Sequence, residues 1–172
     1  FPGPGLGGHC IPIDPFYLTW KAKEIGLNTR FIELAGEINT SMPSYVIDRI
    51  TEALNNSGKP IQGSNILILG LSYKKNVDDL RESPSLEIIN TLIKRGANIT
   101  YCDPFFNSIP STRKYQFSLK GKKLTEDILK KSDIVVLATD HDIYDYELIL
   151  EKSKIIVDTR GKFPASSKII RA

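Results

Sequence analysis

Cysteine is scarce in this sequence of 172 residues, which contains only Cys10 and Cys102. Two cysteines cannot build a disulfide framework, and no group of cysteine and histidine residues has the spacing of a zinc site. A single bridge between Cys10 and Cys102 is the alternative to two free thiols. We expect free thiols, as is usual for chains without export features, and therefore predict a cytoplasmic protein without a bound metal.

Long apolar runs and blocks of like charge are also missing. No run approaches the roughly 18 residues that a membrane-spanning helix needs, and the run NILILGL (65–71) has the length of a strand. The net charge is only +3, and the basic residues are scattered rather than clustered. The sequence therefore predicts neither a membrane nor a nucleic-acid partner.

Glycine and proline are concentrated at residues 3–15, which read GPGLGGHCIPIDP. Glycine permits positive φ and proline fixes φ, so a loop of this composition has a tight and preset backbone. Such a loop holds a group in place, and Cys10 is the candidate. Because the chain begins inside this loop, we expect it to be the C-terminal part of a longer polypeptide.

Two helices are predicted after the glycine loop. Asp14 and Pro15 suit the N-cap and first turn of a helix that stops at Gly26. A second helix covers about 29–56, and Pro43 should bend or restart it.

Apolar residues recur at helical spacing in the second half of that helix. They are Val46, Ile47, Ile50, Ala53 and Leu54. Such a stripe belongs to a core or to a subunit interface. We expect this part of the helix to lie outside the sheet that follows and to pack against a second copy, giving a homodimer.

A turn-rich segment, NNSGKPIQGSN, divides the chain into a catalytic loop with a helical segment (1–59) and a second domain (60–172). In the second domain, apolar strand patterns alternate with helical ones. This alternation is typical of an α/β fold with a Rossmann-like parallel sheet covered on both faces. The predicted strands are 65–70, 98–102, 134–138 and 155–158, and the predicted helices are 84–95, 125–132 and 144–153. The segment 111–119 has no assignment and is a candidate for further strand pairing.

Ligands of parallel sheets bind at the carboxyl ends of the strands. The loop GLSYKKNVDDLRES (70–83) after the first strand carries Lys74 and Arg81 and lacks the G-x-G-x-x-G fingerprint of a dinucleotide site. Cationic side chains beside a helix N-terminus suit a diphosphate. Asp103, His141 and Arg160 follow the later strands, so polar side chains should gather at one edge.

Three motifs, GPGLGGHCIPIDP, GLSYKKNVDDLRESPS and VDTRG, together resemble the UDP-glucose/GDP-mannose dehydrogenase family of nucleotide-sugar 6-dehydrogenases. The resemblance covers essentially the whole chain, in the order of catalytic loop, central helices and nucleotide-sugar-binding domain. It implies an additional N-terminal domain with the NAD fingerprint and a catalytic lysine and asparagine, which this sequence does not contain. It also implies a place in polysaccharide biosynthesis.

The resemblance implies that a sugar C6 alcohol is oxidised to a carboxylate with two NAD+ per turnover. Cys10 then corresponds to the nucleophile that traps the C6 aldehyde as a thiohemiacetal and later carries a thioester. Asp14 matches the carboxylate that orients water, although it could serve only as the helix N-cap. Gly7 and Gly8 would let the backbone approach the sugar closely.

The basic residues also acquire roles through the resemblance. Lys74 matches a lysine that reaches the substrate, Arg81 an arginine in the cleft shared with NAD, and Arg160 an arginine near the nucleotide. The alternative for Lys74 and Arg81 is a solvated basic loop. His9 and His141 lie in family motifs, yet either could simply orient its loop, and Cys102 is expected in the core.

One departure concerns the sugar. UDP-glucose members typically read C-x-P-K-D, whereas Ile13 replaces the lysine here. The motif is more similar to the branch that acts on UDP-N-acetylhexosamines, such as UDP-N-acetylglucosamine 6-dehydrogenase, and uridine is favoured by analogy. We expect the isolated chain to bind a UDP-sugar weakly without catalysis. A stand-alone nucleotide-sugar-binding module is the main alternative; a cysteine hydrolase is disfavoured because Cys10 has no His/Asn partner pattern.

Overall fold

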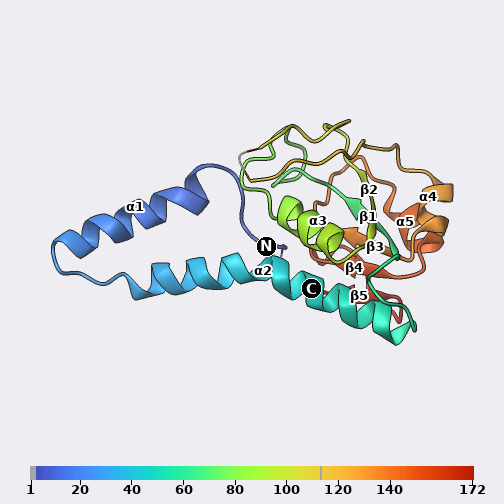
Figure 1. Ribbon diagram of the computed structural model, residues 1–172, viewed down its shortest axis with the longest axis horizontal. Coiled ribbons are helices and arrows are strands. Elements are labelled where there is room, and N and C mark those ends of the chain that lie inside the picture. The colour runs from blue at the N-terminus through green and yellow to red at the C-terminus, as the bar shows by residue number, and fades with distance from the viewer. Residues whose placement is uncertain (1–2, 113) are drawn as a thin grey trace.

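The structure, a computed structural model, describes residues 3–112 and 114–172. Its centre is a five-stranded sheet in the order β2-β1-β3-β4-β5, with every neighbouring pair parallel (Figure 1). The strands are β1 (Asn65–Leu69), β2 (Asn98–Cys102), β3 (Ile134–Leu137), β4 (Ile156–Asp158) and β5 (Ile169–Arg171). The predicted α/β fold with a Rossmann-like parallel sheet is confirmed.

Helices cover both faces of the sheet. They are α2 (Arg30–Asn56), α3 (Pro84–Lys94), α4 (Glu126–Lys131) and α5 (Tyr146–Lys152). In β1, Ile66 and Ile68 pack into the core cluster that contains α2 and α3, whereas Leu67 and Leu69 pack into the cluster that contains α4 and α5. Successive side chains of a strand point to opposite faces, so a continuous apolar strand fills both layers.

Four strands lie where the sequence predicts them, within one residue at each end. β5 was not predicted, because it is only three residues long and its pairing depends on β4, which the sequence pattern does not reveal. Within the segment 111–119, the described residues form no strand, and residue 113 lies outside them. The flanking residues Ser108 and Lys120 form an isolated antiparallel bridge.

Helix α2 runs without interruption for 27 residues and includes Pro43. Of the two predicted effects of Pro43, a restart is wrong, and a bend stays a prediction. The helix continues because Pro43 is buried on the face where α2 meets the domain, so packing holds the chain helical despite the lost hydrogen bond.

The second half of α2 packs on the sheet, which corrects the expectation that it lies outside. Val46 and Ile50 are fully buried, in one cluster with Ile66 and Ile88. Of the two readings of the apolar stripe, core is the right one. The stripe looked unpartnered because the sheet it covers comes later in the sequence. The domain boundary at residues 59/60 stays a prediction, since α2 ends at Asn56.

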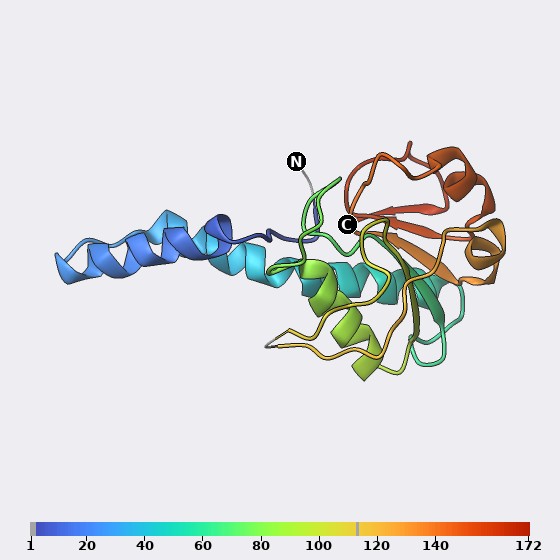
Figure 2. The same ribbon diagram turned by 90° about the horizontal axis from the view of Figure 1, so that it is seen from above.

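The first half of α2 forms an arm together with α1 (Cys10–Glu24), projecting away from the sheet (Figures 1 and 2). The two helices are joined by a hydrogen bond of 2.8 Å between the hydroxyls of Thr29 and Thr19, and by an ion pair between Lys23 and Glu33. The Phe16 ring lies so close to Gly36 that a Cβ added there would be 2.3 Å from it.

Large apolar side chains on this arm are exposed. They include Tyr17, Leu18, Trp20, Ile25, Leu27, Phe31, Leu34 and Ile38. An exposed apolar surface of this extent marks an interaction site.

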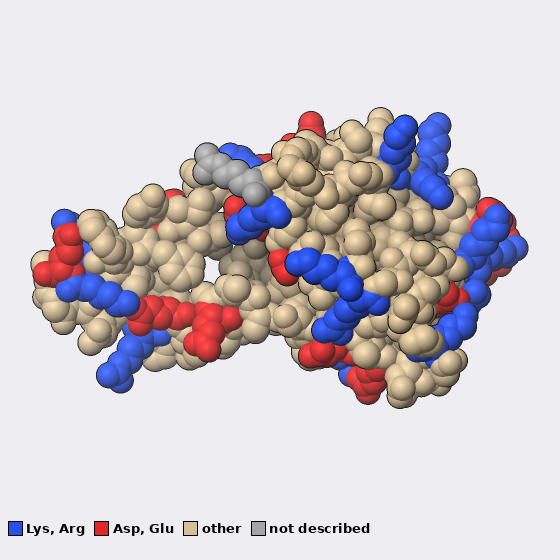
Figure 3. All heavy atoms as spheres, in the orientation of Figure 1, with Lys and Arg blue, Asp and Glu red and all other residues tan. Residues whose placement is uncertain are grey.

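The rest of the surface is of mixed charge. Figure 3 shows basic and acidic side chains interspersed on the face in view, over both the arm and the sheet domain. Within residues 3–112 and 114–172, no helix is both long and apolar enough to cross a bilayer.

Candidate functional site

The carboxyl ends of β1 and β3 meet closely at the edge where the sequence predicts a ligand site. Gly70, directly after β1, has a φ of +89°, and a Cβ added to it would lie 2.4 Å from the Cβ of Thr139. The Thr139 hydroxyl donates a hydrogen bond of 2.6 Å to the Ser72 carbonyl. Glycine is required here because the chain leaving β1 passes against the end of β3.

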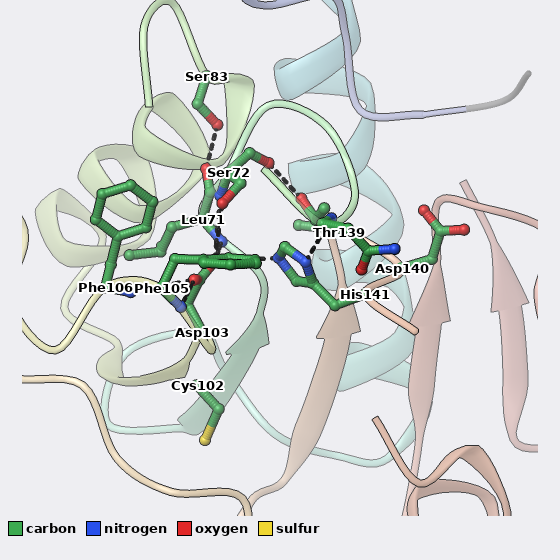
Figure 4. A network of polar contacts seen from close by, with 12 residues as sticks. Leu71, Ser72, Ser83, Cys102, Asp103, Phe105, Phe106, Thr139, Asp140 and His141 are labelled. Atoms are coloured by element: carbon green, nitrogen blue, oxygen red, sulfur yellow. Dashed lines mark hydrogen bonds and ion pairs between the residues drawn. The ribbon is translucent and has the colours of Figure 1, made fainter. Parts of the chain in front are cut away.

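Asp103, directly after β2, organises this edge (Figure 4). Its Oδ2 accepts the backbone N–H groups of Leu71 and Ser72 at 2.7 and 3.2 Å, and its Oδ1 accepts those of Phe105 and Phe106 at 2.8 and 3.3 Å. Burial raises the pKa of Asp103, but hydrogen bonds from His141 and the backbone outweigh it, so the pKa lies below its ordinary value. The carboxylate is therefore ionised and held in place.

His141, after β3, contacts Asp103 from the other side. Its Nε2 lies 3.3 Å from Asp103 Oδ2, and its Nδ1 accepts the Asn76 backbone N–H at 3.0 Å. Both side chains are fully buried. The prediction that Asp103 and His141 lie at the same edge of the sheet is correct, but the sequence did not reveal the contact between their side chains.

These contacts decide whether the pyrophosphate of a dinucleotide can bind at this edge of the sheet. In dinucleotide folds the backbone amides of the turn after the first strand face the pyrophosphate. Here the Leu71 and Ser72 amides are already bonded to Asp103. The described sheet edge therefore does not fit the NAD pyrophosphate, in agreement with the missing fingerprint.

The loop after β1 presents three basic side chains in different surroundings. Lys75 is paired with Asp142 at 3.1 Å. Arg81 is exposed and bonded to the Asp79 carboxylate through two nitrogens, at 3.0 and 2.7 Å. Lys74 is exposed and has no ion-pair partner among the described residues. Of the three, Lys74 is the cation most available to a ligand.

Arg160, after β4, is nearly buried, with 15% of its side chain exposed. Its Nε donates to the Ala138 carbonyl at 2.7 Å, and Asp140 lies 3.9 Å away. Burial lowers the pKa of the Arg160 guanidinium, and the Asp140 carboxylate opposes that effect. A Cβ added at Gly3 would lie 2.8 Å from Arg160 Nη1, so the glycine loop reaches this residue.

The glycine loop also docks on the loop after β1. The Gly8 N–H donates to the Arg81 carbonyl at 2.7 Å. A Cβ added at Gly7 would lie 2.5 Å from the Tyr73 Cβ, and one added at Gly8 3.0 Å from the Tyr73 ring. The close approach that requires glycine here is therefore to Tyr73. The predicted contact of Gly7 and Gly8 with a sugar stays a prediction.

Helix α1 begins at Cys10, four residues before the predicted start at Asp14. The first four N–H groups of a helix have no acceptor within it, so Pro12 fits the first turn without losing a hydrogen bond. Asp14 is therefore not an N-cap. His9 takes that position and makes no side-chain capping bond. Cys10 and Asp14 are one turn apart, on the same face of the helix, and both are exposed.

Arg81 and Cys10 are close enough to interact electrostatically. The hydrogen bond and charge of the Asp79 carboxylate raise the pKa of Arg81 most, and the ionised forms of Tyr73 and Cys10 add to the effect. Cys10 and Cys102 are both free thiols, so the alternative of a bridge between them is wrong. Cys102 is in the core, as predicted, and burial raises its pKa to about 11.

An open cavity of about 1240 Å³ lies where the glycine loop, α2 and the start of α3 meet. Its lining includes Gly5, Asn39, Arg81 and Tyr115. Of the predicted site residues, Arg81 lines this cavity, whereas Cys10, Lys74 and Arg160 do not. The glycine loop thus contacts Arg160 at Gly3 and the Arg81 backbone at Gly8, two residues before Cys10, and Lys74 stands on the same loop as Arg81.

Sequence reasoning missed two residues that position the glycine loop. Asn39 of α2 accepts the Leu6 N–H at 2.7 Å through its side-chain oxygen. Tyr73 supplies the surface against which Gly7 and Gly8 pack. The sequence around Asn39 gives no indication of this role, because Asn39 lies in a helix and its partner Leu6 is 33 residues earlier in the chain. The paired glycines did signal a close approach, but not the partner.

Comparison with known proteins agrees with this geometry. Residues 67–164 match the UDP-binding domain of the UDP-glucose/GDP-mannose dehydrogenase family, and residues 1–41 match the central domain of the same family. NDP-N-acetyl-D-galactosaminuronic acid dehydrogenase of Ralstonia solanacearum is 37% identical over 170 residues, which cover 95% of this chain and 37% of that protein. UDP-N-acetyl-D-mannosamine dehydrogenase of Methanococcus maripaludis (strain C7) is 37% identical, with 93% and 36% covered.

Solved structures show the same fold. UDP-D-ManNAc dehydrogenase of Pyrococcus horikoshii superposes with a TM-score of 0.78 and 28% identity, covering 98% of this chain and 39% of the other. NDP-N-acetyl-D-galactosaminuronic acid dehydrogenase of Methanosarcina mazei superposes with a TM-score of 0.80 and 24% identity, covering 100% and 38%. The chain thus spans well under half the length of the proteins it matches.

Proposed function

This chain belongs to the UDP-glucose/GDP-mannose dehydrogenase family, and we propose that it is the C-terminal part of an NAD-dependent UDP-sugar 6-dehydrogenase. The substrate we propose is a UDP-N-acetylhexosamine, oxidised at C6 to the uronate. Ile13 in place of lysine supports this class, as do the N-acetylhexosamine and N-acetylhexosaminuronate names of relatives that are 37% identical. The complete enzyme would work in the cytoplasm, where Cys10 stays reduced.

The observation that carries the proposal is the hydrogen bond of 2.7 Å from Gly8 N–H to the Arg81 carbonyl. It joins the loop that ends at Cys10 to the loop that presents Lys74. A thiol at the start of a helix and an unpaired cation on a parallel-sheet edge would thus serve a single ligand, with the diphosphate on the cation and the sugar toward the thiol.

Cys10 would act once C6 has reached the aldehyde stage. Its thiolate adds to the aldehyde carbon and forms a thiohemiacetal; oxidation of that adduct leaves a thioester. Water then cleaves the thioester, releasing the carboxylate and restoring the thiol. Asp14, on the same helix face one turn later, is placed to orient that water.

NAD+ supplies the hydride acceptor for both oxidations when it is bound. The described sheet edge does not fit a dinucleotide, because Asp103 occupies the Leu71 and Ser72 amides. We therefore assign NAD binding mainly to the N-terminal domain that the relatives' greater length implies, with Arg81 as the contact from this chain.

The exposed apolar arm supports a homodimer. Trp20 is 62% exposed and Phe31 is 89% exposed on the arm, the part of these two helices that does not cover the sheet. We propose that a second copy covers the arm, in place of the buried second half of α2 to which the sequence had assigned this role.

Calorimetric titration of UDP into this chain tests the binding site. We expect weak binding, and a loss of at least about tenfold in affinity for Lys74→Ala, since a charge-assisted hydrogen bond contributes about 1.5–3 kcal/mol. Lys94→Ala is the matched control, because Lys94 is exposed at the far end of α3. Absence of UDP binding, or equal losses for both variants, would contradict the proposed site.

Two activity measurements separate the enzyme from a stand-alone binding module. This chain alone should form no NADH from NAD+ and UDP-sugars, because a reaction whose partner is not held in place forgoes roughly 7–11 kcal/mol of barrier lowering. In the complete enzyme, Cys10→Ser should still bind the UDP-sugar and stop net uronate formation. Unchanged turnover of that variant would exclude the covalent mechanism.

A further inference from the structure

We propose that Asp103 and His141 form a positioning pair that fixes the place of Lys74 at the sheet edge. The inference rests on the proposed function, in which Lys74 binds the diphosphate. Neither residue of the pair touches the ligand in this scheme. They act through the backbone of the loop after β1.

Lys74 lies between two points of its loop that the pair holds. On the N-terminal side, the Ser72 N–H is bonded to Asp103 Oδ2 at 3.2 Å. On the C-terminal side, the Asn76 N–H is bonded to His141 Nδ1 at 3.0 Å. Only one residue separates Lys74 from each of these points. A cation whose backbone is fixed on both sides loses less conformational entropy when it binds a ligand.

The geometry determines where the proton of His141 resides. Nδ1 accepts an N–H, so it has no proton of its own, and the proton of the neutral ring is on Nε2. Nε2 faces Asp103 Oδ2 at 3.3 Å. The pKa of Asp103 lies below its ordinary value, because the hydrogen bonds that its carboxylate accepts from His141 and from backbone N–H groups outweigh the effect of burial. The ionised carboxylate thus selects the tautomer that leaves Nδ1 free to accept the Asn76 amide.

Asn76 is the point at which this hold is needed. Its φ is +60°, in the left-handed region, which asparagine adopts more readily than most residues but which still costs energy unless contacts support it. Its side chain is also bonded to Asp142, with Nδ2 donating to Oδ2 at 2.6 Å and Oδ1 accepting the Asp142 N–H at 3.1 Å. All these bonds tie Asn76 to the segment that follows β3, so the β1 loop is held by the β3 loop.

His141 is not required merely to satisfy Asp103. That carboxylate already accepts four backbone N–H groups. The ring is itself clamped, with the Phe105 ring at 5.4 Å and the Tyr144 ring at 5.5 Å between centroids. A buried imidazole held between two aromatic rings is a rigid acceptor for a loop amide.

The tautomer is measurable without any variant at the pair. In the chain labelled with ¹⁵N-histidine, only His9 and His141 give signals, and a His9→Gln variant assigns them. We expect His141 to show an unprotonated Nδ1, far downfield, and a protonated Nε2. A protonated Nδ1 would overturn the proposal.

Two substitutions of His141 each remove one of the two hydrogen bonds of the ring and keep the other. In His141→Asn, the amide oxygen can take the place of Nδ1 and accept the Asn76 N–H, but the side chain is too short to reach Asp103. In His141→Gln, the amide can take the place of Nε2 and reach Asp103, but not the Asn76 amide. Each variant loses one bond, so a purely structural role predicts similar losses in both.

A positioning role predicts a difference. We expect UDP affinity to fall about tenfold in His141→Gln and less than about threefold in His141→Asn, from the loss of one hydrogen bond that orders the binding loop. Amide hydrogen exchange at Asn76 should accelerate in His141→Gln and not in His141→Asn. Equal effects of the two variants on affinity and exchange would overturn the proposal. If the unsubstituted chain binds no UDP, the proposed function fails, and exchange at Asn76 still decides the positioning role.

Discussion

The two halves of α2 carry apolar side chains of the same kind in opposite surroundings. Phe31 and Leu34 in the first half are 89% and 51% exposed, whereas Val46 and Ile50 in the second half are fully buried. The helix is continuous between them. The difference comes from what lies opposite: the sheet covers the second half, and in the first half α1 covers one side only. A single helix thus anchors the domain at one end and offers a surface at the other.

The comparison predicts its largest effect in stability. Ile50→Ala should lower the free energy of unfolding by about 2–5 kcal/mol, because it leaves a cavity in the core. Phe31→Ala, on the same helix, should change it by less than about 0.5 kcal/mol at a protein concentration low enough to avoid association. Chemical denaturation followed by circular dichroism measures both. Comparable losses would mean that the arm and the sheet domain are equally well packed.

The reactivity of the two thiols gives a second comparison between the exposed arm and the buried sheet domain. Cys10 is exposed at the base of the arm, while Cys102 is buried at the end of β2, and burial raises its pKa from 9.0 to about 11. A thiol reagent near pH 8 should modify one cysteine of the native chain rapidly and the second at least about a hundredfold more slowly, because the thiolate is the reactive form. Cys10→Ser should remove the fast phase alone. A fast phase that persists in that variant would contradict the burial of Cys102.

The raised pKa of Cys102 also predicts a dependence of stability on pH. The unfolded thiol ionises near its ordinary 9.0 and the folded one near about 11. The contribution of the Cys102 thiol to the free energy of unfolding is therefore fully present below pH 9, and it is lost as the pH rises from 9 toward 11. Cys102→Ala should flatten the fall in stability between pH 9 and 10. An unchanged slope would show that the thiol does not contribute.

The smallest expected effect concerns association. If a second copy covers the arm, Trp20→Ser combined with Phe31→Ser should raise the dissociation constant of the dimer by at least about tenfold, since large apolar groups dominate such interfaces. Ile143→Ser is the control, because Ile143 is 75% exposed away from the arm. Sedimentation equilibrium distinguishes them. A monomer at high concentration before any substitution would contradict the dimer.

The fold was predictable because its signals are local. The strand of residues 65–69 is a short apolar run bounded by turn residues, and Gly96 ends the helix before β2 with a φ of +81°. The start of α1 was not predictable in the same way. Asp14-Pro15 is a strong start signal, yet Pro12 is also tolerated in a first turn, and docking of the glycine loop selects the earlier start at Cys10.

The candidate site was predictable in part. The rule that ligands meet the carboxyl ends of strands brought Asp103, His141 and Arg160 to one edge. It could not show that Asp103 bonds His141, nor that Arg81 is paired with Asp79, because such contacts depend on side-chain geometry between segments. The partner of the apolar stripe from Val46 to Leu54 was hidden for the same reason, since periodicity reports an apolar face without naming what covers it.

The continuity of α2 through Pro43 has a mechanical consequence. A helix of 27 residues is a stiff rod about 40 Å long. Its first half belongs to the apolar arm and holds the glycine loop through Asn39, and its second half is fixed in the core against the sheet. A tilt of about 5° about the inner end would displace the outer end by roughly 3–4 Å over that length. A partner that binds the arm and tilts α2 would therefore also displace the glycine loop that ends at Cys10.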